Sequence, residues 1–369
     1  MVLGVIGSGM ISGIYLKNLT EKFAGIRVKS VASAHLERAE KKAAEYGLVA
    51  TDVDSMLADP EIEMVVILTP VETHEMLVRK ALEAGKHVYA EKTLTTDTAS
   101  SRALYDLAKP KGLGLGCAPD TFLGASLQTA RKAIDDGLIG DVTGFRVTAT
   151  RDNTFFLSNF PFLRNKGAGI AFDYGVYYMT ALVSVLGPVK SLSSFVRAPY
   201  PTFICHRPGT EEDGKAMANP NESEVTAILE MQSGVTGTYL LDADTICRDI
   251  EDLVIFGTKG MVTLGNPNFF GGEVRLTPND WATAETPYMP VTLPMVSHLT
   301  ENSRGIGPAE LAYAVKHGAV SRVDASLACH VLEVLEACIQ GSAGYQVKSE
   351  CTRPEPFSEE QVLETETAT

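Results

Sequence analysis

Short apolar runs alternate with helical patterns in the first third of the chain. Four such runs are each followed by a polar turn: Val2–Ile6, Val28–Ala32, Met64–Leu68 and Val88–Ala90. Between them, apolar residues recur every three or four positions, which is the spacing of one helix face. Strands that alternate with helices predict an α/β fold with a parallel, doubly wound sheet whose short βα loops share one edge.

After Gly116 this alternation stops. Asp120 is placed to cap the start of a helix that runs through Leu123 to Ile134. The chain then alternates with a period of two in six segments: Val142–Thr150, Val189–Val196, Val225–Met231, Val235–Leu241, Leu253–Phe256 and Met261–Leu264. We therefore expect an α+β domain with an open, mostly antiparallel sheet, one face covered by helices and the other free for another subunit.

With 369 residues, the chain is too long for one typical core. We expect a dinucleotide-binding Rossmann domain over residues 1–119 and a domain for substrate binding and oligomerisation over residues 120–369. Further helical patterns occur at Pro308–His317 and Ala325–Gln340.

Charge and composition limit the classes of partner. The formal net charge of −14 argues against nucleic acid or an anionic membrane surface, because both reward clustered Lys and Arg. The six cysteines show no metal-ligand spacing, so no metal is expected. No apolar signal segment is recognised, and Val176–Leu186 is too short to span a membrane. These features predict a cytoplasmic protein that acts on a small molecule.

The turn after the first strand has the glycine spacing of a phosphate-binding loop. Gly7 permits a tight turn, and Gly9 lets the backbone approach a pyrophosphate at the start of the next helix. Gly7, Gly9, Met10 and Ile11 are therefore candidate contacts of a dinucleotide. The last glycine, Gly13, lies one position later than the usual pattern has it.

The end of the second strand favours NADP over NAD. Ser33 lies 20 residues after Gly13, where an acidic residue usually binds the ribose 2′-hydroxyl of NAD. A hydroxyl at this position does not repel a 2′-phosphate, and Arg38 can supply positive charge. NAD remains open, since Arg38 is equally well explained as a solvated residue on a helix.

Polar residues follow the third and fourth strands. Thr69, Pro70 and His74 come after one strand, and Glu91 and Lys92 come directly after the next. Because the carboxyl ends of parallel strands meet at one edge, all five are expected on the cofactor side of the sheet.

The helical segment "GAGIAFDYGVYYMTALVSVLG" carries the other candidate groups. Asp173 and Tyr177 are four residues apart and share one helix face, and Tyr174 and Tyr178 form a second such pair. A buried tyrosine bonded to a neighbouring aspartate would explain the pattern without any function. A carboxylate and a phenol on so apolar a helix are also candidates for substrate binding.

Four motifs together make the chain resemble a known family. "GVIGSGMISG", "TPVETH", "AGKHVYAEK" and "GAGIAFDYGVYY" occur in the order expected for the Gfo/Idh/MocA group, named after glucose–fructose oxidoreductase and inositol dehydrogenase. The resemblance covers nearly the whole chain. It implies a Rossmann domain and an open-sheet domain, often used for dimer or tetramer contacts, in an NAD(P)-dependent dehydrogenase or reductase of sugars or cyclitols.

The resemblance also assigns roles to residues. It places the lysine of the family's E-K-P motif at Lys92, the aspartate of its D-x-G-x-H segment at Asp173, and the histidine that often acts as acid and base at Tyr177. Thr93 departs from the motif's proline, which leaves the backbone less constrained. Asp120 and Thr121, in the segment "GCAPDTFLG", are candidates to hold sugar hydroxyls, although capping alone explains Asp120.

Our hypothesis assigns proton transfer to Tyr177. A free phenol titrates near 10, and a neighbouring Lys92 together with an oxidised nicotinamide would lower that pKa. Asp173 would position both groups. Lys92 as the proton carrier is the alternative. Arg304 and His317 could also line the pocket, but each is equally well explained as a residue flanking a helix.

Two other functions remain open from the sequence. One is a glycoside-processing enzyme that keeps NAD(P) bound and oxidises the sugar only transiently. The other is a nucleotide-sensing regulator without turnover, although a sensor needs none of Lys92, Asp173 and Tyr177.

Overall fold

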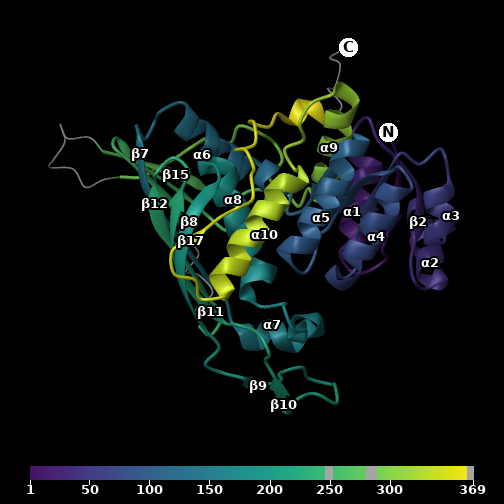
Figure 1. Ribbon diagram of the computed structural model, residues 1–369, viewed down its shortest axis with the longest axis horizontal. Helices are drawn as coiled ribbons and strands as arrows, with labels where there is room; N and C mark the ends of the chain where they lie inside the picture. The colour runs from purple at the N-terminus through teal and green to yellow at the C-terminus, as the bar shows by residue number, and fades with distance from the viewer. Residues whose placement is uncertain (246–251, 280–288, 364–369) are drawn as a thin grey trace.

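The computed structural model describes residues 1–245, 252–279 and 289–363. Two sheets form its framework, with helices between them (Figure 1). In these residues, no helix has the length and apolar character needed to cross a membrane.

The first sheet is parallel and doubly wound, as predicted. Its strands are, in spatial order, β3 (Val49–Thr51), β2 (Arg27–Ala32), β1 (Val2–Ile6), β4 (Met64–Ile67), β5 (His87–Ala90) and β6 (Leu115–Cys117). They are connected by α1 (Ser12–Glu21), α2 (Leu36–Tyr46), α3 (Val53–Ala58), α4 (His74–Glu83) and α5 (Thr98–Ala108). β1, β4 and β5 are neighbours, so the loops after them share one edge of the sheet.

The second sheet contains all six predicted strands. Its order is β16 (Val291–Thr292), β15 (Val274–Pro278), β14 (Gly260–Leu264), β13 (Asp252–Gly257), β7 (Val142–Thr150), β12 (Thr236–Asp242), β11 (Glu224–Met231), β8 (Val189–Arg197) and β17 (Tyr345–Gln346). Described neighbours run antiparallel, apart from the parallel pair β7 and β12. Apolar residues at alternate positions of each strand face inward. The alternation of apolar and polar residues in the sequence therefore predicted the strands correctly.

Helices cover only the inner face of this sheet in the part of the chain that the structure describes. α6 (Ala125–Asp135), α8 (Val176–Leu186) and α10 (Ala325–Ile339) lie between the sheet and the first domain (Figure 1). The outer face carries exposed apolar side chains such as Phe195 and Ile228.

The end of the chain returns to the first sheet. α9 (Ile306–His317) lies near α1 (Figure 1), and the amide of Cys117 in β6 donates to the carbonyl of Val323, which precedes α10. The proposed boundary between residues 119 and 120 stays a prediction, because α9 and α10 pack with elements of the first domain although they belong to the later sequence.

A smaller projection follows β7. It consists of α7 (Asn153–Asn159), a 3₁₀ turn (Pro161–Arg164) and the hairpin of β9 (Thr202–Ile204) and β10 (Ala216–Ala218). Figure 1 shows this projection extending from the main body on the side away from the chain termini.

Candidate active site

The dinucleotide loop has the geometry that its glycines require. Gly7 adopts a positive φ of 120°, and a Cβ there would lie 2.7 Å from the carbonyl group of Leu68. A Cβ on Gly9, by contrast, would meet no described heavy atom within 4 Å. Met10 is largely exposed and Ile11 precedes the first turn of α1. The start of α1 is thus open to a phosphate group.

Ser33 follows β2 and Arg38 lies on α2, the next helix. The Ser8 hydroxyl donates to the Ser33 hydroxyl over 2.8 Å, so Ser33 is directly beside the glycine turn. Arg38 is exposed on the first turns of α2. Neither position carries the carboxylate that would repel a 2′-phosphate.

His74 lies between the loops after β4 and β5, and its contact with a cofactor stays a prediction. The residue is fully buried, and its two ring nitrogens lie 2.8 Å from the Thr93 carbonyl oxygen and 2.9 Å from that of Thr69. The imidazole therefore links the loop after β4 to the loop after β5 from inside the protein. Thr69 and Pro70 remain on the accessible side of that loop.

Lys92 follows β5 and points toward the second domain. Its Nζ donates to Asp173 Oδ1 and to the Asp173 carbonyl oxygen, both over 2.8 Å. Burial opposes the charge of Lys92, but Asp173 and Tyr177 outweigh it and raise the pKa of the amine. The preceding residue, Glu91, accepts a hydrogen bond of 2.8 Å from the Tyr15 hydroxyl, and the peptide bond between Lys92 and Thr93 is cis.

Asp173 lies in a π-helical turn, Ala171–Gly175, that leads directly into α8. Its second oxygen, Oδ2, accepts a hydrogen bond of 2.6 Å from Nη1 of Arg151. Burial disfavours the carboxylate, but the two cations outweigh burial and lower the pKa of Asp173 to about 2. Lys92, Asp173 and Arg151 form an ionised group that we call the charged cluster.

Tyr177 lies beside this cluster. The Lys92 Nζ is 5.4 Å from the centre of its ring, and Nη2 of Arg304 approaches its hydroxyl to 3.5 Å. Burial raises the pKa of the phenol, while Lys92 and Arg304 oppose that rise. Lys92 thus lowers the pKa of Tyr177, as expected, but burial outweighs the two cations.

Tyr174 and Tyr178 form the predicted second pair. Their hydroxyl groups are 3.4 Å apart and their rings meet edge to face. The Tyr174 ring lies 5.8 Å from the Arg151 guanidinium, so Tyr174 borders the charged cluster on one side.

Asp120 and Thr121 are buried, and their role as sugar ligands stays a prediction. Asp120 Oδ2 accepts hydrogen bonds from the amides of Gly305 (3.1 Å) and Gly307 (3.0 Å), at the start of α9. Asp120 is therefore a cap, but of a helix distant in sequence; α6 begins after Gly124 instead. Burial raises the pKa of Asp120 to about 6, against the Gly307 amide and Arg304, which lower it.

Sequence reasoning missed Arg151 and set Arg304 aside. Arg151 comes directly after β7, where only its place at a strand end could have marked it. Arg304 precedes α9 and is held by Asn268, whose Oδ1 accepts from Nη2 over 2.6 Å. Asn18 of α1 donates to the Arg304 carbonyl oxygen over 2.8 Å, which fixes this loop against the first domain. His317 lies at the exposed end of α9, away from this group.

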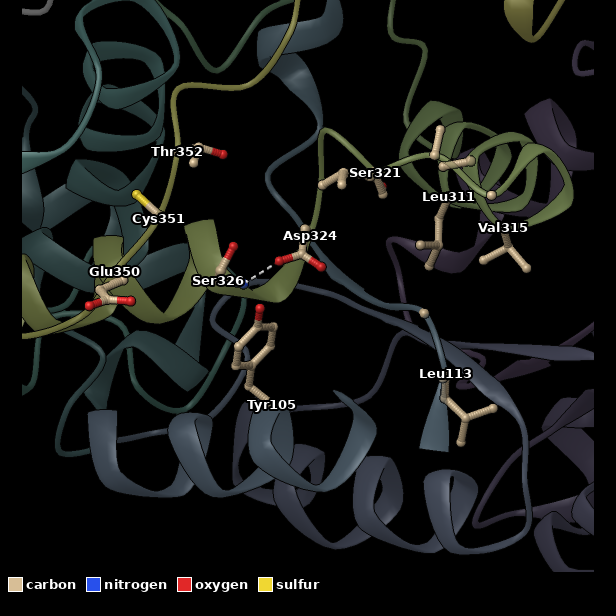
Figure 2. A pocket seen from close by; sticks show the side chains of 16 residues that line it. Tyr105, Leu113, Leu311, Val315, Ser321, Asp324, Ser326, Glu350, Cys351 and Thr352 are labelled. Carbon is tan, nitrogen blue, oxygen red and sulfur yellow. Dashed lines mark hydrogen bonds between the residues drawn. The ribbon is translucent and has the colours of Figure 1, made fainter. Parts of the chain in front are cut away.

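A separate cavity of about 590 Å³ lies between α5, α9 and the start of α10. Figure 2 shows Tyr105 below Ser326 and Asp324, with Leu113, Leu311 and Val315 on the opposite wall. None of the candidate residues lines it. The charged cluster and this cavity are thus different features of the molecule.

Comparison with known proteins identifies the family. The model of the GFO/IDH/MocA oxidoreductase family with an NAD-binding Rossmann fold matches residues 1–117, and the model of the family's C-terminal domain matches residues 127–263. The chain belongs to the GFO/IDH/MocA oxidoreductase family, and its first domain has the NAD-binding Rossmann fold.

Individual relatives share about 30% of their residues with this chain, over part of its length. An uncharacterized oxidoreductase of Schizosaccharomyces pombe is 31% identical over 194 residues, 52% of this chain and 53% of that protein. The scyllo-inositol 2-dehydrogenase (NAD(+)) of Bacillus subtilis is 28% identical over 265 residues, 71% and 72% of the two chains. The chain spans about half the length of the first curated relatives that it matches.

Solved structures extend the likeness to nearly the whole chain. Levoglucosan dehydrogenase in its apo form superposes with a TM-score of 0.81 at 19% identity, covering 95% of this chain and 99% of that chain. The same enzyme has been solved in complex with NADH. At this identity the likeness shows the fold of both domains.

Proposed function

We propose that the protein is an NAD(P)-dependent oxidoreductase that moves a hydride between the nicotinamide and a secondary alcohol or ketone of a sugar, cyclitol or glycoside. The observation that carries the proposal is the convergence of three groups from distant segments. Lys92 comes from the cofactor edge of the first sheet, and Asp173 and Tyr177 come from the helix of the second domain. The names of the inositol and levoglucosan dehydrogenases support the substrate class.

The residues at the first glycine turn fit a dinucleotide. The open space above Gly9 and the free start of α1 can accept a pyrophosphate, and Thr69, Pro70 and Glu91 border the same edge. A bound nicotinamide would supply hydride transfer. Ser33 and Arg38 support NADP as the favoured form, because no acid occupies the position of Ser33.

The protein's own residues would then handle the proton and orient the hydroxyl. Tyr177 would exchange the proton with the reacting oxygen. Lys92 and Arg304 are two cations that stabilise the phenolate form, each against the cost of burial. The raised pKa of Lys92 keeps it an ammonium group, which makes it a better fixed charge than a base and favours Tyr177 as the proton carrier.

The charged cluster would keep Lys92 in position. Asp173 contacts the ammonium through a side-chain and a main-chain oxygen, and Arg151 holds the other carboxylate oxygen. Because each of its oxygens is bound by a different cation, the Asp173 carboxylate would limit the motion of the Lys92 ammonium group.

The outer face of the second sheet supports a homo-oligomer. Phe195 and Ile228 are exposed there on neighbouring strands, and no described helix covers them. Exposed apolar side chains on an open sheet favour contact with a second copy of the chain.

A screen of polyols and glycosides with NAD and NADP in parallel tests the proposal, read by absorbance of reduced nicotinamide and by release of any aglycone. Replacing Tyr177 with Phe or Lys92 with Met should lower turnover by at least about 100-fold, because each removes a group that acts at the reacting oxygen. Cofactor affinity should change little.

Tyr178→Phe is the matched control on the same helix, and its turnover should stay near that of the wild type. Near-normal turnover of Tyr177→Phe would exclude the phenol as proton carrier and leave Lys92. Aglycone release without net reduction would indicate the redox-neutral glycoside reaction instead. A protein that binds cofactor but turns over no member of the screen would be a sensor.

A further inference from the structure

Four phenylalanines beside the charged cluster lie outside both hydrophobic cores. They are Phe155 and Phe156 of α7, Phe160 after it, and Phe162 of the following turn. Phe155 is 41% and Phe162 55% exposed, whereas Leu157 and Leu163 of the same segment are buried. The two leucines anchor the segment, and we call the four aromatic rings the phenylalanine row.

The rings of this row contact one another in sequence. The centres of Phe155 and Phe156 are 5.4 Å apart with perpendicular planes, and those of Phe156 and Phe160 are 6.0 Å apart and stacked. Phe160 and Phe162 follow at 6.2 Å, edge to face. These distances and angles are the favoured geometries of aromatic pairs. The row is thus an ordered apolar surface of rings.

The row contacts the charged cluster through its second ring, Phe156. The Arg151 guanidinium carbon lies 4.9 Å from the centre of the Phe156 ring, and the same guanidinium holds Asp173. Beyond the outer end, Asn165 donates to Glu72 over 3.1 Å, in the loop that follows Thr69 and Pro70. The segment that carries the row thus contacts the charged cluster at Phe156 and the loop after β4 at Asn165.

We infer that the phenylalanine row is a second subsite, which binds a planar apolar group joined to the sugar, namely an aryl aglycone. This inference rests on the proposed function, since it assumes that the sugar lies at Lys92 and Tyr177. The charged cluster offers ionic and hydrogen-bonding groups suited to hydroxyls, while the row offers ring faces and edges that can stack on an aromatic group. Continuity with the cluster favours a small molecule over a second copy, for which the outer sheet face is available elsewhere.

Matched glycosides test the inference by calorimetry on the full-length protein saturated with NAD(P). Phenyl and methyl β-D-glucopyranoside form one pair, and phenyl and methyl β-D-galactopyranoside the other. At least one phenyl glycoside should bind about 10-fold tighter than its methyl partner. Phe162→Ser should reduce that ratio to about threefold or less, and Phe162→Leu should retain part of it.

Phe195→Ser, which alters an even more exposed phenylalanine on the outer sheet face, should leave the ratio unchanged. Equal affinity for phenyl and methyl glycosides in the wild type would overturn the inference, as would a ratio that survives in the Phe155→Ser/Phe162→Ser double variant. A change in oligomeric mass of that variant, without a change in the ratio, would identify the row as a contact between copies.

The outcomes separate this inference from the proposed function. Turnover of a polyol without binding of any glycoside would remove the subsite and leave the oxidoreductase intact. A phenyl advantage that depends on Phe162, in a protein without turnover, would keep the subsite and refute the enzymatic proposal.

Discussion

Asp173 and Asp120 are aspartates with little exposure to solvent, yet their pKa values shift in opposite directions. Asp173 has a side chain that is 18% exposed and bonds two cations, and its pKa falls to about 2. Asp120 is 1% exposed and bonds two backbone amides, and its pKa rises to about 6. Burial raises the pKa in both places, so the difference comes from the charge of the partners.

The two aspartates differ in the charge of the groups that bind them. Lys92 and Arg151 each carry a full positive charge, and each binds a different oxygen of Asp173. The carboxylate therefore stays ionised and acts as a fixed counter-charge for Lys92. The amides at the start of α9 carry only partial charges, and the nearest cation, Arg304, is shared with Asn268 and Tyr177. Asp120 therefore serves as a cap whose carboxyl group stays protonated to a higher pH than that of Asp173 and loses its proton only near pH 6.

The largest effect that would test this comparison is expected from Asp173→Asn. Removing the carboxylate leaves Lys92 and Arg151 as close cations without their shared counter-charge. We expect the free energy of unfolding to fall by about 3–5 kcal/mol at pH 7, measured by urea denaturation. Because the pKa of folded Asp173 lies below its ordinary value, its stabilisation is present above about pH 4 and is lost as the pH falls toward 2. The difference between variant and wild type should shrink over that interval.

Asp106→Asn is the control for this variant. Asp106 is exposed on α5 and lies 3.7 Å from Arg102, so its removal should change stability by less than about 0.5 kcal/mol. Equal effects of the two substitutions would mean that the charged cluster contributes no more than a surface ion pair.

Asp120→Asn should change the free energy of unfolding less than Asp173→Asn does, and in the opposite direction. The pKa of folded Asp120 is above its ordinary value, so the wild type loses stability as the pH rises from about 4 to about 6. The whole loss is at most about 3 kcal/mol. An asparagine oxygen can still accept from the amides of Gly305 and Gly307, so the variant should lack this slope.

Denaturation of the Asp120→Asn variant at pH 4, 6 and 8 measures this slope directly. The free energy of unfolding of the variant should increase relative to that of the wild type as the pH rises. Parallel curves for variant and wild type would show that folding leaves the pKa of Asp120 unchanged, which would contradict the contrast with Asp173.

Local pattern predicted most of the fold. The six strands of the second sheet begin and end within one residue of their predicted limits, because alternation with a period of two marks each strand directly. The position of Lys92 after β5 and the shared helix face of Asp173 and Tyr177 also follow from short-range spacing. Each of these features depends on residues that are close in sequence.

The missed parts depend on contacts between distant segments. Arg151 and Asp173 are 22 residues apart, and Arg304 and Tyr177 are 127 apart, so no local pattern joins them. Asp120 illustrates the same limit: its residue type indicates a cap, but the helix that it caps begins about 185 residues later. The direction of the Tyr177 pKa could not be predicted either, since it depends on burial.

The smallest effect is expected from the replacement of an exposed charged residue, because water weakens the interactions of its charge. Arg38 is exposed on α2, near Ser33 at the edge of the dinucleotide loop. If it contacts the 2′-phosphate of NADP, Arg38→Ala should lower kcat/KM for NADP about two- to fivefold and leave the value for NAD unchanged, because exposed ion pairs contribute about 1 kcal/mol or less. Added salt should weaken the NADP preference of the wild type in the same way, since water and ions screen this charge but reach the charged cluster far less. Arg79→Ala on α4 serves as the control and should leave both values unchanged. An equal loss with NAD and NADP would place Arg38 outside the cofactor site.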